Sequence, residues 1–534
     1  MKKNPFLFNE RLFLILVLAV TFITRIALLK YRNFPEGDGF HYVSLAKYFM
    51  RGDFSSISTY WSLGWPGLIA LFSLIFKTDV ELSGRLLNTL FGTGLIAVSY
   101  FFAKRFFNQR IARYAALLMA VNLWLINYST YLFTESLYAL LIMLTLFLGW
   151  VSLEKQKKRY YFLLGALLGF SYTVRNEAMV FVLIFLAMIV GRNYKKAWLH
   201  MTMLLLGLAL FLLPLILFYH HQYGIWTLGE KGHLNFWFGE DINSYRAITE
   251  PTNDFSESVY VKSLSDEIQR NGLFAYLYKN KFFIHRLALN YKRVLLYLPS
   301  QFLAIPFLGP VLFWLFFLLG SYTCLLKDKS WRIKYLYLLL FPALALTLVA
   351  LCNVEERKTT PFIPIFILII CTGIYHLETL LHSRKIRSLY YTLCILVLAT
   401  SSVMAFEKAK KSEFITSKQI LQHLLMKEAG LWMRANLSQS GKTMLYEALV
   451  AYYFYEKTPN NITGLLYFKD YQTLLRRMRL EQAQYLVIGS WLAEENPAVD
   501  YLMKNMQAPE LELLKTLKKG KFEVRIYQLR QGVK

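Results

Sequence analysis

The chain has 534 residues, of which 56% are hydrophobic and 17% aromatic but only 18% are charged. Soluble domains are about 45–50% apolar and about 25% charged, so this composition excludes a disordered or fibrous chain and is typical of a membrane protein. The formal net charge is +26. Much of this basic charge stands between long apolar runs, where it marks cytoplasmic loops rather than a nucleic-acid-binding surface.

Apolar runs that approach the ~20 residues of a spanning helix recur along the first three quarters of the chain. The first run follows Lys2, Lys3 and Arg11 and lacks the small-residue cleavage site of a signal peptide, so we expect a retained helix. Two shorter segments, 40–50 and 67–76, are predicted to lie along the outer membrane face. In total the sequence predicts about eleven spans, near residues 12–29, 83–103, 111–131, 135–152, 160–174, 177–191, 196–219, 302–326, 332–352, 361–381 and 388–405.

Every second connection between these runs is short and basic. By the positive-inside bias we expect these connections and the N-terminus to be cytoplasmic. The complementary connections, which include the long stretch 220–300, are then extracytoplasmic, as is everything after residue 406. The basic connections lie near residues 104–113, 155–159, 192–196, 327–334 and 384–387.

The last part of the chain has a different pattern. Short apolar or alternating runs predict strands at 444–445, 485–488 and 522–527, between helices predicted at 421–436, 471–480 and 498–506. We therefore expect a polytopic α-helical membrane domain over 1–405. Residues 406–534 are expected to form a small soluble α/β domain outside the membrane.

Four groups of polar residues fall in predicted outer loops, where the basic-loop pattern does not explain them. They are Glu36-Gly37-Asp38-Gly39-Phe40-His41, Thr134-Glu135-Ser136, Thr173-Val174-Arg175-Asn176-Glu177, and the stretch from Glu355 to Pro364 with Arg357 and Lys358.

Each group has an ordinary alternative. Asp38 and Glu135 are placed as helix caps would be, Arg175 and Glu177 as a local ion pair would be, and the last group as an interfacial anchor would be. Because the topology puts all four at one depth, their combination predicts an acid–base site beside an anion site. The sequence has no His/Cys set with metal-ligand spacing, and a divalent cation held by Asp38 or Glu135 stays open.

Several motifs in this order are similar to those of one enzyme family. The chain resembles the bacterial GT-C glycosyltransferases of the dolichyl-phosphate-mannose–protein mannosyltransferase type, in the RgtA/B/C/D-like branch related to the aminoarabinose transferase that modifies lipid A. The resemblance covers roughly residues 10–365. It rests on Asp38, Trp65-Pro66, Arg85-Leu86-Leu87-Asn88, Thr134-Glu135, Thr173 to Glu177, the glycine-bracketed stretch 232–239 and Arg357 to Pro364. Asn176 and Thr359-Thr360 depart from the family pattern.

The resemblance implies a bacterial inner-membrane enzyme that moves a sugar from a polyprenyl-phosphate donor to a hydroxyl of a lipid, glycan or protein acceptor, with inversion. Asp38 would be the general base, with Glu135 as a second catalytic residue, and no cofactor is implied beyond the open cation. Arg357, Lys358 and Arg175 would bind the donor phosphate, and His41, Glu177, Asn235 and Trp237 the substrates. Trp237 has interfacial anchoring as its alternative.

Two other functions remain open at this point. An O-antigen ligase or polymerase would also use lipid-linked sugars outside the cell. A lipid-linked sugar transporter or flippase would instead show an internal repeat and polar residues across the membrane, and the sequence has neither feature clearly.

Overall fold

The computed structural model describes residues 9–54, 57, 59–192, 194–229, 282–351, 355–411, 417–445, 448–455, 462–464, 468–494, 496–505 and 508–530. The chain divides into two compact units. The first comprises Met1–Tyr31 and His41–Lys411, and the second comprises Arg32–Phe40 and Ser412–Lys534. A short segment from the N-terminal part of the chain therefore belongs to the C-terminal unit.

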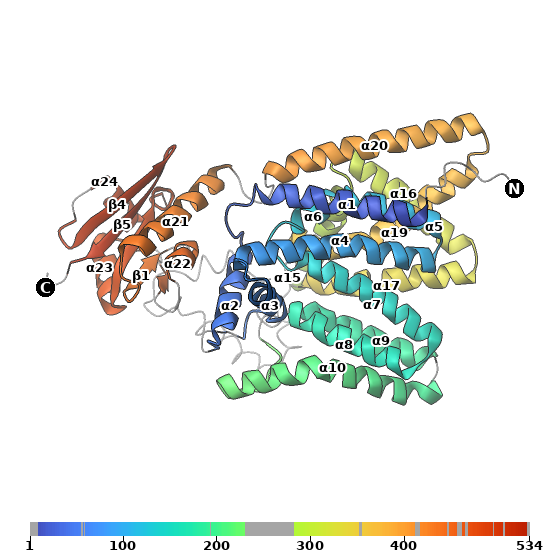
Figure 1. Cartoon of the computed structure of the whole chain (residues 1–534), viewed down its shortest axis with the longest axis horizontal. Helices are drawn as coiled ribbons and strands as arrows, with labels where there is room; N and C mark the ends of the chain where they lie inside the picture. Colours follow the sequence, from blue (N-terminus) through green and yellow to red (C-terminus); the bar gives the residue numbers. More distant parts are fainter. Residues whose placement is uncertain are drawn as a thin grey trace. The chain divides into compact units, whose positions relative to one another are not determined.

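The described part of the first unit is built of helices (Figure 1). In chain order these are α1 (Glu10–Leu29), α2 (Gly39–Arg51), α3 (Gly64–Phe76), α4 (Val80–Phe106), α5 (Gln109–Ala120), α6 (Leu123–Tyr128), α7 (Glu135–Lys155), α8 (Lys158–Val174), η1 (Asn176–Ala178), α9 (Met179–Arg192), α10 (Tyr194–Tyr223), α15 (Phe282–Ser300), α16 (Leu308–Leu326), α17 (Lys329–Leu351), α18 (Glu356–Thr359), η2 (Thr360–Phe362), α19 (Ile363–Leu380) and α20 (Arg384–Lys411).

Among the described residues, eight helices are long and apolar enough to cross a membrane. They are α1, α4, α7, α10, α16, α17, the continuous stretch from α18 to α19, and α20. This confirms the predicted polytopic helical fold. The predicted runs 160–174 and 177–191 form the shorter helices α8 and α9, of 17 and 14 residues.

The predicted continuous span over 111–131 is wrong, because the helix breaks between α5 and α6 at Asn122. The Asn122 side chain caps α6 by accepting from the Leu125 amide at 3.0 Å. Its amide nitrogen also donates to the carbonyls of Gln301 and Phe302, at 2.7 and 2.9 Å. A buried polar side chain with these local and distant partners stabilises the break.

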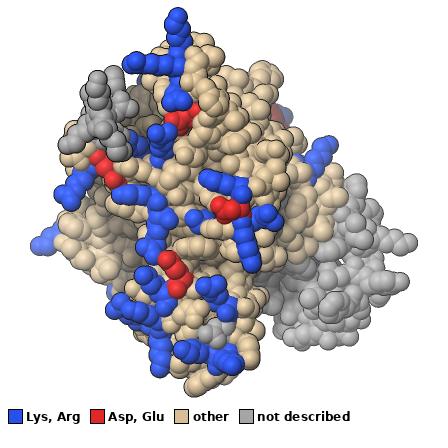
Figure 2. Space-filling model, turned by 90° about the vertical axis from the view of Figure 1, so that its right-hand side faces the viewer, with Lys and Arg blue, Asp and Glu red and all other residues tan. Residues whose placement is uncertain are grey.

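The basic helix ends of the first unit gather at one end, which Figure 2 shows as a face rich in lysine and arginine with few acidic groups. Ion pairs connect neighbouring helices at this end. Arg105 contacts Glu154 at 2.8 Å, and Arg110 contacts Glu378 at 3.0 Å. The end of α4, the end of α7, the start of α5 and the end of α19 therefore meet there.

Glycines allow close helix contacts in the described part of the first unit. A Cβ atom on Gly165 of α8 would lie 1.9 Å from the carbonyl oxygen of Leu204, and one on Gly207 of α10 would lie 2.0 Å from that of Phe162. No other residue fits there, so the backbones of α8 and α10 lie against each other, as small residues permit between membrane helices. This contact holds α8, which ends directly before Arg175.

The second unit contains a five-stranded sheet of order β2-β1-β3-β5-β4. Strand β1 (Lys442–Leu445) runs parallel to β2 (Ile462–Gly464) and to β3 (Ala483–Gly489). Strand β5 (Phe522–Leu529) is antiparallel to both β3 and β4 (Leu511–Lys519). The helices are α21 (Ser417–Asn436), α22 (Ala448–Phe454), α23 (Tyr471–Leu480) and α24 (Pro497–Lys504). The predicted small α/β fold is confirmed.

Candidate active site

The site begins with a stretch of buried, non-helical backbone between α6 and α7. Buried carbonyl groups outside regular structure need hydrogen-bond donors, and here side chains of α3 and α4 supply them. The donors are held on rigid helices, so they fix the point at which α7 begins and with it Glu135. Asn88 donates to the carbonyls of Tyr131 and Phe133, both at 2.7 Å, while Thr89 donates to Ser129 at 3.0 Å, Arg85 to Thr130 at 3.0 Å and Trp65 to Leu132 at 3.1 Å.

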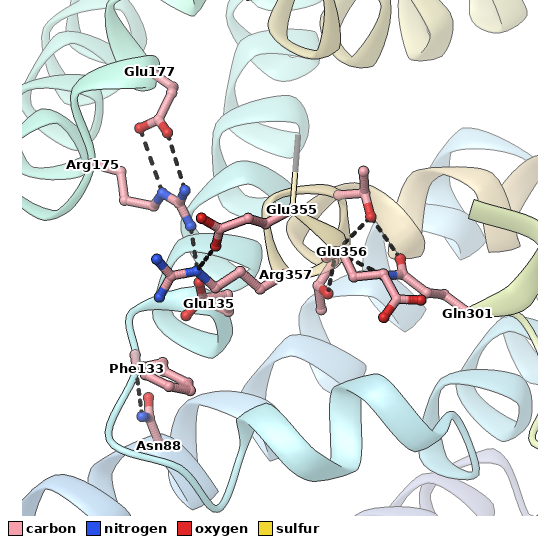
Figure 3. A network of polar contacts seen from close by, with 11 residues as sticks. Asn88, Phe133, Glu135, Arg175, Glu177, Gln301, Glu355, Glu356 and Arg357 are labelled. Carbon is pink, nitrogen blue, oxygen red and sulfur yellow. Dashed lines mark hydrogen bonds and ion pairs between the residues drawn. The ribbon is translucent and has the colours of Figure 1, made fainter. Parts of the chain in front are cut away.

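Arg175 links two carboxylates next to this stretch (Figure 3). Its Nη1 lies 3.3 Å from Oε1 of Glu135, and its Nη2 lies 3.0 Å from Oε1 of Glu177. The guanidinium also lies over the ring of Tyr138, 5.3 Å from its centroid. Residues from two separately predicted loops are therefore in direct contact. Arg175 forms the predicted local ion pair with Glu177 and also a long-range ion pair with Glu135.

These charges are largely removed from solvent. The Arg175 side chain is 13% exposed and that of Glu135 only 4%. Burial raises the pKa of Glu177, but the Arg175 guanidinium outweighs it and brings that pKa down to about 2, with Lys358 adding to the lowering. Glu177 and Arg175 thus form a charged pair at neutral pH, and Lys358 lies close enough to act on it.

Arg357 brings a further cation to the same neighbourhood. Its guanidinium lies 5.7 Å from the centroid of the Phe133 ring, in the stretch that precedes Glu135. Its Nε donates to Glu355 at 2.6 Å, as Figure 3 also shows. With Lys358 next in sequence, the start of the α18–α19 stretch places two cations beside the Glu135–Arg175–Glu177 cluster.

Gln301 braces this cationic segment, a role that the sequence did not indicate. Its amide nitrogen donates to the Glu356 carbonyl at 2.8 Å, and both residues are labelled in Figure 3. Its amide oxygen accepts from the Thr359 hydroxyl at 2.8 Å. Both Gln301 and Thr359 are buried. Thr359, one of the departures from the family pattern, therefore has a structural partner.

The remaining predicted site residues are placed differently. His41 is the first residue of the long segment His41–Lys411 of the first unit. Its ring stacks on that of Trp61, with centroids 4.4 Å apart. Trp61 lines a small pocket together with Thr173 and Asn176, so His41 approaches the loop that carries Arg175.

Asp38 belongs to the Arg32–Phe40 segment of the second unit. Asn235 and Trp237 lie outside the described residues. Within the described ranges no three His, Cys, Asp or Glu side chains gather as they would around a metal ion.

Comparisons with known proteins agree with this architecture. Residues 63–218 match the family model described as dolichyl-phosphate-mannose-protein mannosyltransferase. That segment contains the carbonyl donors, Glu135, Arg175 and Glu177. No curated protein sequence matches the chain.

Solved structures match nearly the whole chain. The apo oligosaccharyltransferase from Archaeoglobus fulgidus is similar over 91% of this chain and 70% of its own, with 11% identity and a TM-score of 0.63. The same archaeal enzyme, AglB, in complex with an inhibitory peptide and a dolichol-phosphate gives a TM-score of 0.58 at 11% identity, over 89% of this chain and 69% of its own. ArnT from Cupriavidus metallidurans, bound to undecaprenyl phosphate, is similar over 96% of this chain and 97% of its own, with 10% identity and a TM-score of 0.58.

Proposed function

From the GT-C fold and the mannosyltransferase-family segment, we propose that the protein is a membrane glycosyltransferase that moves a sugar from a polyprenyl-phosphate donor to an acceptor hydroxyl. The observation that carries the proposal is the cluster of Glu135, Arg175 and Glu177 with Arg357 and Lys358 beside it. Two structural neighbours are described with dolichol-phosphate or undecaprenyl phosphate bound, which supports a lipid phosphate as the carrier.

The proposed reaction is a single displacement at the anomeric carbon. The acceptor hydroxyl oxygen forms the new bond to that carbon, and its proton passes to the carboxylate of Asp38. The bond between the anomeric carbon and the phosphate oxygen breaks, and the electron pair leaves with the polyprenyl phosphate. Because attack and departure occur on opposite faces, the sugar configuration inverts.

The cations have a distinct task in this scheme. A phosphate is a good leaving group and needs no general acid, but the charge that develops on it is stabilised by fixed positive groups. Arg357 and Lys358 are the proposed ligands of that phosphate. Arg175 is already held by two carboxylates, so we assign it mainly to orientation of Glu135, with the phosphate as a secondary partner.

We also propose the orientation of the protein in the membrane. The basic end in Figure 2 would face the cytoplasm by the positive-inside bias. Glu135 begins α7, whereas that helix ends at the basic end with Lys155. The candidate site would then open on the extracytoplasmic side of the bacterial inner membrane. Glu177, with a divalent cation if the reaction requires one, would bind the substrates there.

The test is transfer by the purified full-length protein, supplied with a polyprenyl-phosphate sugar and a pool of envelope lipids and glycans. Mass spectrometry follows both the glycosylated product and the released polyprenyl phosphate. Loss of a general base lowers the rate by about 10²- to 10⁴-fold, so Asp38→Asn should be almost inactive although it is expressed and inserted. Asp53→Asn is the matched control and should retain the native rate. Native transfer by Asp38→Asn would refute the base assignment.

A further inference from the structure

The segment that carries Asp38 is held by the C-terminal unit at both of its ends. Before Asp38, the carbonyl of Asn33 accepts from Nζ of Lys427 at 2.6 Å. The Phe34 ring stacks on His423, with centroids 5.1 Å apart and planes 12° apart. After Asp38, the Phe40 ring meets Tyr452 edge-on at 5.6 Å. Helix α21 therefore contacts the residues just before the acidic loop, residues 36–39, and α22 contacts the residue just after it.

The contacting side chains are themselves fixed. The Nδ1 atom of His423 lies 2.7 Å from the Gln419 carbonyl one turn earlier in α21, which sets the orientation of the ring. The Lys427 ammonium lies 4.9 Å from the centroid of the Tyr453 ring of α22, in addition to its contact with Asn33. Each group is thus restrained by a second partner, as expected of residues that position a loop.

The loop between these contacts is a tight turn. The Gly39 amide donates to the Glu36 carbonyl at 2.7 Å, and the Phe40 amide donates to the Gly37 carbonyl at 3.2 Å. Gly37 has φ +42°, in the left-handed region that glycine adopts without strain. The backbone on both sides of Asp38 is therefore closed by hydrogen bonds, and its placement follows from that of residues 33, 34 and 40.

We infer that the C-terminal unit is the part of this protein that positions Asp38, with Lys427, His423 and Tyr452 as positioning residues. This inference rests on the proposed function, in which Asp38 is the base. The chain passes between the two units on each side of the loop, after Tyr31 and after Phe40, as well as after Lys411. The loop that carries the proposed base is thus packed into the C-terminal unit.

A merely structural tether would make the same contacts, so the test must separate attachment from positioning. The double variant Phe34→Ala/Lys427→Met removes the ring stack and the ammonium contact without touching Asp38. The control is Lys504→Met, the same lysine change in the same unit, where the exposed Lys504 pairs with Asp500 one turn earlier in α24. All variants are studied as the full chain in lipid nanodiscs.

Two measurements are made on each variant. Misplacement of a reacting group by about 1 Å costs up to roughly 10²-fold in rate. We therefore expect kcat of the double variant to fall by roughly 10- to 100-fold with little change in the donor KM. Hydrogen exchange at the amides of Gly39 and Phe40 should become faster in the double variant, and Lys504→Met should match the native protein in both readouts.

The outcomes separate this inference from the proposed function. Native kcat in the double variant, together with an inactive Asp38→Asn, would overturn the positioning role and leave the base assignment intact. Lower kcat together with a fully active Asp38→Asn would overturn the base assignment and the inference that rests on it. A fall in kcat with unchanged exchange at Gly39 and Phe40 would also overturn the inference. Tyr452→Ala, which removes the ring that meets Phe40, should also lower kcat, and a native kcat in that variant would overturn the positioning role of Tyr452.

Discussion

Arg175 offers the sharpest test of the site, because one guanidinium pairs with two carboxylates, the buried Glu135 and the half-buried Glu177. Replacing it with methionine keeps a similar aliphatic volume but removes the charge and the donors. Glu135 and Glu177 would then lose the guanidinium that lies 3.3 Å from Glu135 and 3.0 Å from Glu177. The substitution therefore removes one member of a largely buried ion pair and leaves its carboxylate partners in place, which is the costly way to break such a pair.

The magnitude follows from the exposure of the partners. Removing one member of a buried pair costs about 3–5 kcal/mol. The Glu135 side chain is 4% exposed, but that of Glu177 is 27% exposed and is partly screened by solvent. We therefore take the lower limit and expect Arg175→Met to lower the free energy of unfolding by about 3 kcal/mol, roughly a hundredfold in the unfolding equilibrium.

The assay is unfolding by sodium dodecyl sulfate in mixed micelles, followed by far-ultraviolet circular dichroism. The control is Arg105→Met, an identical change at the exposed pair with Glu154, where the two side chains are 41% and 48% exposed. That pair should contribute at most about 1 kcal/mol. Glu177→Gln in the Arg175→Met background should restore part of the loss. If Arg175→Met is no less stable than Arg105→Met, the cluster is not the buried ionic unit described above.

Three further predictions concern the surroundings of this cluster. Asn88→Leu leaves the buried carbonyls of Tyr131 and Phe133 without that donor, at about 1–3 kcal/mol each, so its melting temperature should fall sharply; an unchanged melting curve would contradict the role of Asn88. Gly64→Ala should lower both stability and transfer, because its Cβ would lie 2.3 Å from the Thr173 hydroxyl, whereas Gly67→Ala on the same helix meets nothing within 4 Å and should be neutral in both assays. Arg357→Lys keeps the charge but loses the planar fork, so the donor KM should rise several-fold at near-native stability, and an unchanged KM would remove Arg357 from the donor site.

The fold was largely predictable because its signals are local. Apolar run length and basic loops identify membrane helices one by one, a short apolar run identifies β3, and alternation identifies β5. Strand β4 was not predicted, because Lys515, Lys518 and Lys519 interrupt the apolar–polar alternation of this edge strand. Lysines on an edge strand protect it against pairing with another chain. The break at Asn122 was not predicted either, because the carbonyl groups that accept from its side chain belong to residues 301 and 302, far along the chain.

The site was predictable in part, for a related reason. Ionisable residues at the ends of apolar runs stand out in any sequence, so Glu135, Arg175 and Arg357 could be proposed as candidates from the sequence alone. Their pairing was not derivable, because loop sequences do not specify which distant side chain they meet. Gln301 belongs to no recognisable sequence motif. Its contact with Thr359 depends on the packing of α15 against α18, which the sequence does not specify.

The most direct test of the central claim is the affinity of the purified protein for undecaprenyl phosphate against that for undecaprenol, which shares the tail but lacks the phosphate. If Arg357 and Lys358 bind the carrier phosphate, the native protein should prefer the phosphate by at least about tenfold, since a charge-assisted contact contributes about 1.5–3 kcal/mol. The double variant Arg357→Ala/Lys358→Ala should lose that preference while still binding the tail. Equal affinity of the native protein for the two lipids would contradict the assignment of this site to a lipid-phosphate donor.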